Sequence, residues 1–353
     1  MDSPAQDSRL ARWSAHTLFW PSATLLLLLV ISAIVSPGFL RIGWFEGHLS
    51  GNLIDVLNRA APLMLVSIGM TLVIAVRGLD ISVGAVVAIS AAVAAIAIGG
   101  SLSAGDAAQV SRLPLSVAIA SALGVALLCG LWNGLLVVKA GMQPIIATLI
   151  LMVAGRGIAQ LITDGQIITI YYSPYFYIGN GFLLGLPFAL FIALITAAAI
   201  HVALTRTALG LFIRSIGINP VAARVAGVRA RLITVCLYVF CSFTAGLAAL
   251  IISSNVKSAD GNNAGQLMEL DAILAVTLGG TSLAGGRFSL LGTILGALII
   301  QTLTSMIYSM GVPPEVNLVV KALLVFAVML LQSPEFRATL RRLAFRAEPG
   351  AAA

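Results

Sequence analysis

Charged side chains are scarce in this sequence: Asp, Glu, Lys and Arg together make up 9% of its 353 residues. Soluble domains carry about 25% of these residues, because a surface in water has to be covered with polar groups. Lipid removes this requirement, since apolar side chains can face acyl chains. The shortage of charge therefore excludes an ordinary soluble protein. A hydrophobic content of 59% and a mean hydropathy of +1.05 indicate a membrane protein.

Motifs for chemistry are also missing. The chain has no Gly-x4-Gly-Lys-Ser/Thr phosphate loop, no His-Glu-x-x-His pair and no Gly-x-Ser-x-Gly turn. The three cysteines, Cys129, Cys236 and Cys241, lack the spacing of a metal site, and we expect them to pack as small side chains. These absences argue against a nucleotide site, a metal site and a membrane-embedded enzyme. The net charge of +7 then indicates basic loops on one membrane face rather than nucleic-acid binding.

Long apolar runs dominate what is present. A helix needs about 20 apolar residues to cross the hydrocarbon core. The first run is longer than the core of a secretory signal peptide, so we expect it to be retained as a span. The expected fold class is an all-α polytopic membrane protein with about ten transmembrane helices. The predicted spans are 18–36, 60–77, 81–100, 115–138, 144–162, 183–204, 232–254, 270–284, 288–309 and 317–332.

The distribution of Lys and Arg orients these spans. Most of the basic residues fall in cytoplasmic segments if both termini are cytoplasmic, as the positive-inside rule requires. We therefore predict a cytoplasmic tail over 1–17, a transmembrane domain over 18–332 and a second cytoplasmic tail over 333–353. In this orientation the external basic residues are Arg41, Arg59, Arg112 and Lys257.

One region allows two arrangements. The stretch from Ala60 to Gly100 contains only two charged residues, Arg77 and Asp80. It is either two spans joined by a tight cytoplasmic turn or a span followed by a broken helix. Transporters use broken helices where the backbone lines a cavity.

The longest predicted cytoplasmic segment, 205–231, contains five arginines and no acidic residue. Its pattern predicts a helix from Ala208 to Ile216 and a break at Gly217. Asn219 is then the N-cap of a second helix, with Pro220 in the first position. This second helix carries a small apolar face. The segment is either a basic loop beside the membrane or a docking helix for a cytoplasmic partner.

The same segment carries a resemblance to a known family. Its matching residues are Gly210, Arg214, Gly217, Asn219, Ala222, Ala223 and Gly227. They look like the loop by which permease subunits of bacterial ATP-binding-cassette importers couple to their ATPase. Further stretches are similar to the sugar branch of that family, which includes ribose permeases: 70–75, 78–85, 132–134, 147–157, 270–276 and 285–288. The chain looks closest to permeases for galactofuranose in the stretches 58–62, 159–163, 260–265 and 313–315.

The resemblance covers roughly residues 50–332 and implies a division of labour. It implies that this chain is the transmembrane permease subunit of an importer that moves a sugar, galactofuranose, into the cytoplasm. The chain itself would bind no cofactor, since ATP is used by a separate cytoplasmic ATPase subunit. The other implied partners are a second permease, identical or related, and a periplasmic sugar-binding protein. The implied location is the bacterial inner membrane, in contact with lipid and with no nucleic acid.

Polar side chains within spans are the candidates for a translocation path, because such groups are costly in lipid and usually face the bundle interior. The candidates are Asp80, Ser82, Trp132, Asn133, Arg156, Gln160 and Gln301. Each has a structural alternative. Arg156 can bond to carbonyl groups of a neighbouring segment, Asp80 and Ser82 can cap a helix, and the amides can join helices.

Glu269 and Asp271 are candidates for docking the external binding protein, because they open a predicted span from the outside. The alternative is that they are ordinary acids in the first turn of a helix. A second function also remains open, that of an ion-coupled secondary sugar transporter. It requires an intramembrane acid, and Asp80 is the candidate for that acid.

Overall fold

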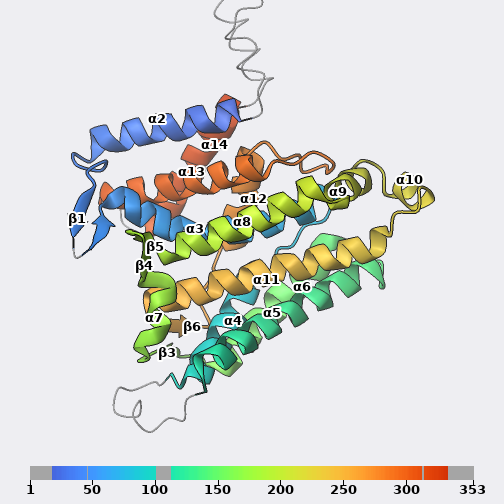
Figure 1. Cartoon of the computed structure of the whole chain (residues 1–353), viewed down its shortest axis with the longest axis horizontal. Coiled ribbons are helices and arrows are strands. Elements are labelled where there is room, and N and C mark those ends of the chain that lie inside the picture. Colours follow the sequence, from blue (N-terminus) through green and yellow to red (C-terminus); the bar gives the residue numbers. More distant parts are fainter. Residues whose placement is uncertain (1–17, 46, 101–112, 312–313, 333–353) are drawn as a thin grey trace, which may run out of the picture.

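The computed structural model describes residues 18–45, 47–100, 113–311 and 314–332, so the two predicted tails lie outside the described residues. Helices make up most of the structure (Figure 1). The helices are α2 (Phe19–Val35), α3 (Asn52–Ala75), α4 (Val83–Ile98), α5 (Leu115–Val138), α6 (Pro144–Ile162), α7 (Ser173–Asn180), α8 (Phe188–Arg206), α9 (Leu209–Ile218), α10 (Pro220–Val225), α11 (Ala230–Val256), α12 (Met268–Leu278), α13 (Leu290–Ser309) and α14 (Pro314–Gln332). Six short strands form antiparallel pairs: β1 (Gly43–Phe45) with β2 (His48–Ser50), β3 (Ile167–Thr169) with β6 (Ser258–Asp260), and β4 (Phe182–Leu183) with β5 (Leu186–Pro187).

Six of the described helices are long and apolar enough to cross a membrane, namely α3, α5, α6, α8, α11 and α13. The expectation of a helical polytopic membrane protein is therefore confirmed. Other expected spans correspond to shorter helices, with 17 residues in α2, 16 in α4 and 11 in α12. At 1.5 Å per residue, α4 covers about 24 Å and α12 about 17 Å of a hydrocarbon core about 30 Å thick.

Some predicted spans differ in outline from the helices observed. The helix at the span expected over 60–77 begins earlier, at Asn52, because the polar residues before Ala60 continue the same helix. The span expected over 270–284 ends as a helix at Leu278, because the following loop turns through glycines with positive φ, among them Gly280 and Gly285. The span expected over 183–204 begins later, at Phe188, because the preceding residues form the β4–β5 hairpin. Apolar composition cannot distinguish a helix from such apolar turns.

The stretch from Ala60 to Gly100, for which the sequence allowed two arrangements, contains the short helix α4, which follows a largely buried segment. Residues 76–82 connect α3 to α4 without regular helix. Asp80 and Ser82 in this segment are fully buried. Apart from the exposed Arg77, the connection therefore lies largely in the protein interior.

The core forms around α3 and α11. In the most apolar part of α3, 83% of the residues are buried, compared with 22% in α5 and α8 and 28% in α6. Small residues allow the inner helices to approach closely. At Gly130 of α5, for example, an added Cβ atom would lie 2.6 Å from the Cα atom of Val239 in α11. The outward apolar faces of α5, α6 and α8 are available to lipid or to another chain.

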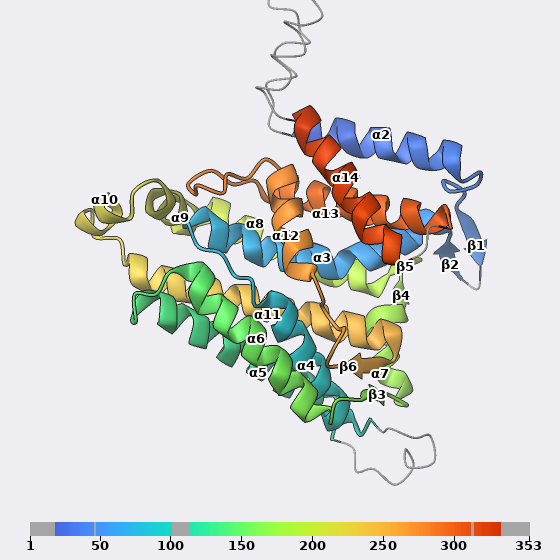
Figure 2. The same cartoon turned by 180° about the vertical axis from the view of Figure 1, so that it is seen from behind.

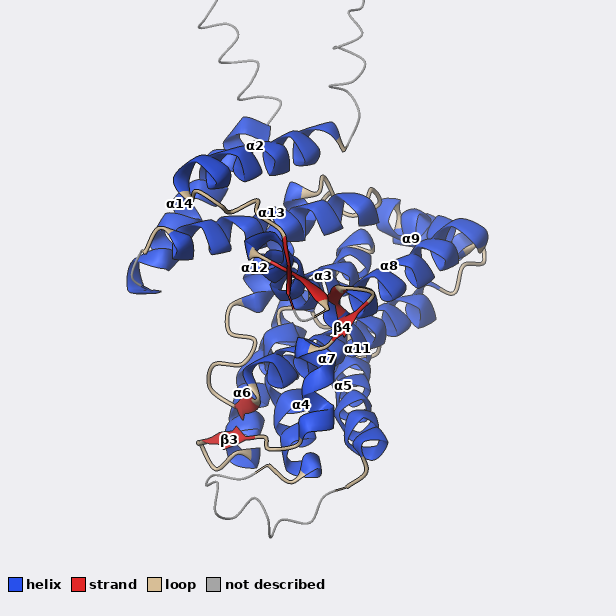
Figure 3. Ribbon diagram, turned by 60° about the vertical axis from the view of Figure 1, so that its left-hand side comes forward, coloured by secondary structure: helices blue, strands red, loops and turns tan. Residues whose placement is uncertain are grey.

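The two ends of the helical bundle differ. The three strand pairs and α7 gather at one end, which we call the strand end (Figure 1). Helices α9 and α10 project from the opposite end, which we call the α9–α10 end (Figure 2). The strands remain small additions to an otherwise helical molecule in the third view (Figure 3).

Candidate functional site

The segment expected to couple to an ATPase folds into α9 and α10. The side chain of Asn219 accepts hydrogen bonds from the backbone amides of Val221 and Ala222, both at 3.0 Å. The predicted N-cap is therefore confirmed, but the break expected at Gly217 is wrong, because α9 continues to Ile218. Val225 on α10 is 85% exposed. The small helix thus presents an uncovered apolar face at the α9–α10 end.

The break between α9 and α10 is joined to α3 through what we call the Arg77 junction, formed by Ala75, Arg77, Gly217, Ile218 and Gly286. The Arg77 guanidinium donates from Nε to the carbonyl of Gly217 and from Nη2 to that of Ile218, each at 2.6 Å. The amide of Gly286 donates to the carbonyl of Ala75 at 2.9 Å. The last carbonyl groups of a helix have no hydrogen-bond donor within the helix, and here the Arg77 guanidinium is that donor. The junction thereby ties α9 both to α3 and to the loop that precedes α13.

The structure requires glycine at the matching positions of this segment for different reasons. An added Cβ atom at Gly217 would overlap the carbonyl oxygen of Ala75 and the amide nitrogen of Gly286, and one at Gly210 would overlap the carbonyl oxygen of Leu204. Gly227 has open space around it, but its φ of +83° favours glycine. Sequence reasoning identified these glycines and missed Arg77, which it treated only as one more basic residue.

The remaining predicted coupling residues lie on both small helices. Arg214 of α9 stacks over the ring of Phe288, with its guanidinium carbon 5.4 Å from the ring centre. It also lines a cavity of about 190 Å³ together with Ser289. On α10, Ala222 is exposed and Ala223 is buried.

Three of the predicted path residues form a buried hydrogen-bonded cluster, Asp80, Ser82 and Asn133, before the start of α4. One Asp80 oxygen, Oδ1, accepts from the Ser82 amide at 3.0 Å and from the Ser82 hydroxyl at 2.6 Å. The Asn133 amide donates to the same oxygen at 3.3 Å and to the Ser82 hydroxyl at 2.8 Å. All three residues are 0% exposed. In this conformation they therefore join the entry of α4 to α5 and do not face an open cavity.

Two oxygens of this cluster are buried without a hydrogen-bond partner among the described residues. They are Oδ2 of Asp80 and Oδ1 of Asn133. When Asp80 is ionised, both oxygens can only accept hydrogen bonds, so no hydrogen bond can form between them without an added proton. A protonated Asp80 would add a donor and avoid burying an unpaired charge.

Arg156 and Gln160 lie together at a second place, a cavity of about 410 Å³ between α4, α6 and α12. We call it the Arg156 cavity, and Glu269 also lines it. The Arg156 guanidinium donates to the carbonyl of Ala264 at 2.6 Å, and the Gln160 amide donates to the side chain of Asn262 at 2.7 Å. Both side chains therefore hold the 260–264 loop and also line the cavity.

Asp260 keeps that loop in shape. Its carboxylate accepts from the backbone amides of Asn262 and Asn263 at 2.8 and 3.2 Å, and from the Asn263 side chain at 2.7 Å. Partial burial raises the pKa of the Asp260 carboxyl. These hydrogen bonds and the Arg156 guanidinium together lower the pKa by more than burial raises it, so the pKa lies below its usual value. Asp260 therefore stays ionised and fixes the loop that accepts from Arg156.

Other predicted residues lie apart from these two places. Trp132 is 53% exposed on the outward face of α5. Gln301 lines a different cavity, between α3 and α13. Of the two acids expected to dock a binding protein, Asp271 forms an ion pair with Lys321 of α14 at 2.6 Å, and Glu269 is only 4% exposed. The structure thus separates residues that the sequence grouped together.

Comparison with known proteins places this chain in a family. Residues 52–329 match the family described as branched-chain amino acid transport system / permease component. The galactofuranose transporter permease protein of Escherichia coli is 47% identical over 90% of this chain and 91% of the relative. The fructose import permease of Bifidobacterium longum is 36% identical over 91% of this chain and 89% of the relative. The ribose import permease of Escherichia coli is 34% identical over 88% of this chain and 91% of the relative. No solved structure matches the chain.

The similarity to these relatives extends over nearly the whole chain, well beyond the α9–α10 segment. They are transport components and not enzymes, in agreement with the missing catalytic motifs. The apolar helices fit a multi-pass protein of the inner membrane. The chain belongs to the family of transport-system permease components, as a permease subunit of an ATP-binding-cassette importer.

Proposed function

We propose that this chain imports a sugar, galactofuranose, into the cytoplasm, driven by ATP hydrolysis on a separate ATPase subunit. The observation that carries the proposal is the 47% identity to a galactofuranose permease along nearly the whole chain. The fructose and ribose permeases among the relatives support a sugar as the substrate class. The chain would bind no nucleotide, because ATP is used by the partner.

The proposed topology has ten crossings and both termini in the cytoplasm. The helices α2, α4, α12 and α14 would complete the set with the six spans named above. The α9–α10 end would then be cytoplasmic, which agrees with the arginines of that segment and the positive-inside rule. The strand end would face the periplasm and meet the sugar-binding protein.

The Arg156 cavity is the proposed part of the sugar path. A charged side chain in a span usually marks a path or an internal pair. Here Arg156 and Gln160 offer hydrogen-bond donors on a helix that is only 28% buried in its most apolar part. A second permease, identical or related, would cover this side and close the path between two chains. Asp80, Ser82 and Asn133 would set the position of α4 along it.

ATPase contact is proposed for α10, which presents small apolar side chains at the α9–α10 end. The Val225→Asp variant is therefore expected to lower ATP-driven uptake about tenfold, because a carboxylate would have to be desolvated in the contact. The measurement is uptake in proteoliposomes, together with the amount of ATPase that co-purifies. Val256→Asp is the matched control, since Val256 is 66% exposed at the opposite end of the molecule. Equal loss in both variants would contradict a contact specific to α10.

The proposed function is tested by purification from native membranes in mild detergent, with accompanying chains identified by mass. We expect a stoichiometric ATPase chain, and uptake in proteoliposomes that requires ATP and is insensitive to ionophores. Uptake without any ATPase that collapses on addition of an ionophore would instead establish an ion-coupled carrier.

A further inference from the structure

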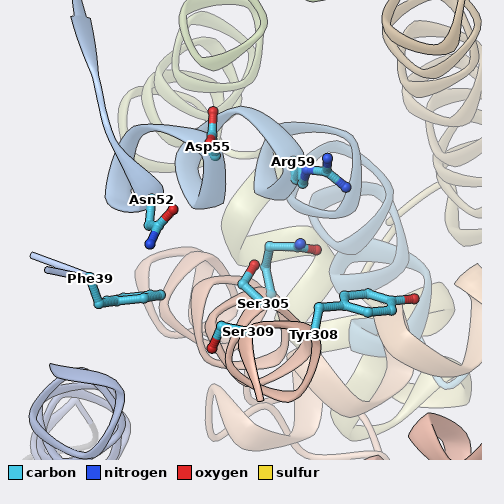
Figure 4. A pocket seen from close by; sticks show the side chains of 8 residues that line it. Phe39, Asn52, Asp55, Arg59, Ser305, Tyr308 and Ser309 are labelled. Atoms are coloured by element: carbon cyan, nitrogen blue, oxygen red, sulfur yellow. The ribbon is translucent and has the colours of Figure 1, made fainter. Parts of the chain in front are cut away.

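A further cavity, of about 430 Å³, opens at the strand end between α3 and α13 (Figure 4). We call it the strand-end crevice. Its volume lies in the range of small-molecule sites, about 300–1,000 Å³. It is formed by α3 and α13, whereas the Arg156 cavity is formed by α4, α6 and α12. The two cavities are therefore separate places on the chain.

The lining of the crevice is polar in a chain that has few polar residues. From α3 it receives Asn52, Asp55 and Arg59, at spacings of three and four residues that share one helix face. From α13 it receives Gln301, Ser305 and Tyr308, again at helical spacing. Figure 4 shows both sets along neighbouring ribbons, with Phe39 at one side. Two polar stripes that line one cavity are suited to a hydrated path and not to contact with acyl chains.

The charged groups of the crevice are free to meet a ligand. The side chains of Asp55 and Arg59 form no hydrogen bond or ion pair with any other residue that the structure describes, although they stand four residues apart. The Gln301 amide also has no hydrogen-bond partner within the described residues. The carboxylate accepts, the guanidinium donates and the amide does both. The opposite charges cancel, so the lining favours a neutral ligand with many donors and acceptors over a phosphate or a metal cation.

We propose that the strand-end crevice is a sugar-binding subsite, distinct from the Arg156 cavity, that receives the sugar on the outer side. This inference rests on the proposed function for its substrate class and orientation. Sugar hydroxyl groups donate and accept, which matches Asp55, Arg59 and Gln301. The ring of Tyr308, which is 53% exposed, offers apolar surface to the C–H face of a sugar ring. The path would then include two sugar subsites.

The test is direct binding of methyl β-D-galactofuranoside to the full-length permease purified in detergent, followed by saturation-transfer NMR. We expect the wild type to bind, and Arg59→Gln and Gln301→Leu each to raise the Kd about tenfold, because each loses a hydrogen-bonding group. Arg41→Gln is the matched control, an exposed arginine near the same end that does not line the crevice. Thermal unfolding of each variant checks that it remains folded.

Outcomes for this subsite and for the proposed function are distinguishable. Unchanged Kd values in Arg59→Gln and Gln301→Leu, or no binding to the wild type, would overturn the subsite even if the assembled wild-type importer transports the sugar. Absence of ATP-driven uptake by the assembled wild-type importer would overturn the proposed function, whatever the isolated permease binds. An equal rise of the Kd in Arg41→Gln would also overturn the subsite, since the effect would then follow charge alone.

Discussion

Gly217→Ala is expected to lower ATP-driven sugar uptake about tenfold or more, because overpacking a tight site costs about 1–3 kcal/mol. The added Cβ atom would overlap the Ala75 carbonyl oxygen and the Gly286 amide nitrogen. Both are backbone atoms, so no side-chain rotation can relieve the overlap. The Arg77 junction would have to open, and α9 would lose its link to α3. Uptake in proteoliposomes with the ATPase bound is the measurement.

A matched variant separates this effect from a change in helix propensity. Gly124 lies in α5 and has open space where its Cβ atom would be. Gly124→Ala is therefore expected to leave uptake unchanged and to stabilise the helix slightly, by up to about 1 kcal/mol. If ATP hydrolysis continues in Gly217→Ala while uptake falls, the junction transmits motion between the ATPase and α3. Normal uptake in Gly217→Ala would refute that role.

Asp80→Ala is expected to destabilise the protein strongly. The carboxylate oxygen Oδ1 accepts from the Ser82 amide, the Ser82 hydroxyl and the Asn133 amide. Each buried donor left without an acceptor costs about 1–3 kcal/mol. The melting temperature should therefore fall by about 5 °C or more, given about 2–4 °C per kcal/mol for a large chain. Thermal unfolding in detergent measures the change.

Asp80→Asn tests what the buried group does. Asparagine keeps the Oδ1 acceptor and adds a donor in place of the unpartnered Oδ2, so we expect near-normal stability and transport. Ser90→Ala is the control for a buried polar group in α4, because the Ser90 hydroxyl has no partner among the described residues and its loss should cost little. A stable Asp80→Asn protein that no longer transports would favour ion coupling through Asp80 and contradict the ATP-driven proposal.

Part of the site was accessible from local sequence because its cause is local. Asn219 and Pro220 begin α10, since a capping side chain and a proline at the first position act within one turn. The glycines of the same segment were recognised from a pattern. Their reasons differ, and the contact at Gly217 involves residues more than 60 positions away along the chain.

Other parts depended on contacts between distant segments. Arg77 resembles any basic residue at the end of a span until its hydrogen bonds to Gly217 and Ile218 are known. In the same way, Asp271 appeared to be an exposed acid, but it is paired with Lys321 fifty residues later. Pairing is decided by where helices pack, and periodicity within one helix contains no such information.

The sequence by itself determined that the chain spans a membrane, where its apolar runs lie, and how α10 begins, because composition and first-turn chemistry act locally. Tertiary structure alone decided where α4 begins and where α12 ends, since buried or glycine-containing turns can be as apolar as a helix. It also divided the polar residues among the Asp80 cluster, the Arg156 cavity and the strand-end crevice. Costly polar groups in an apolar bundle gather where partners from other helices meet them, and only packing determines those places.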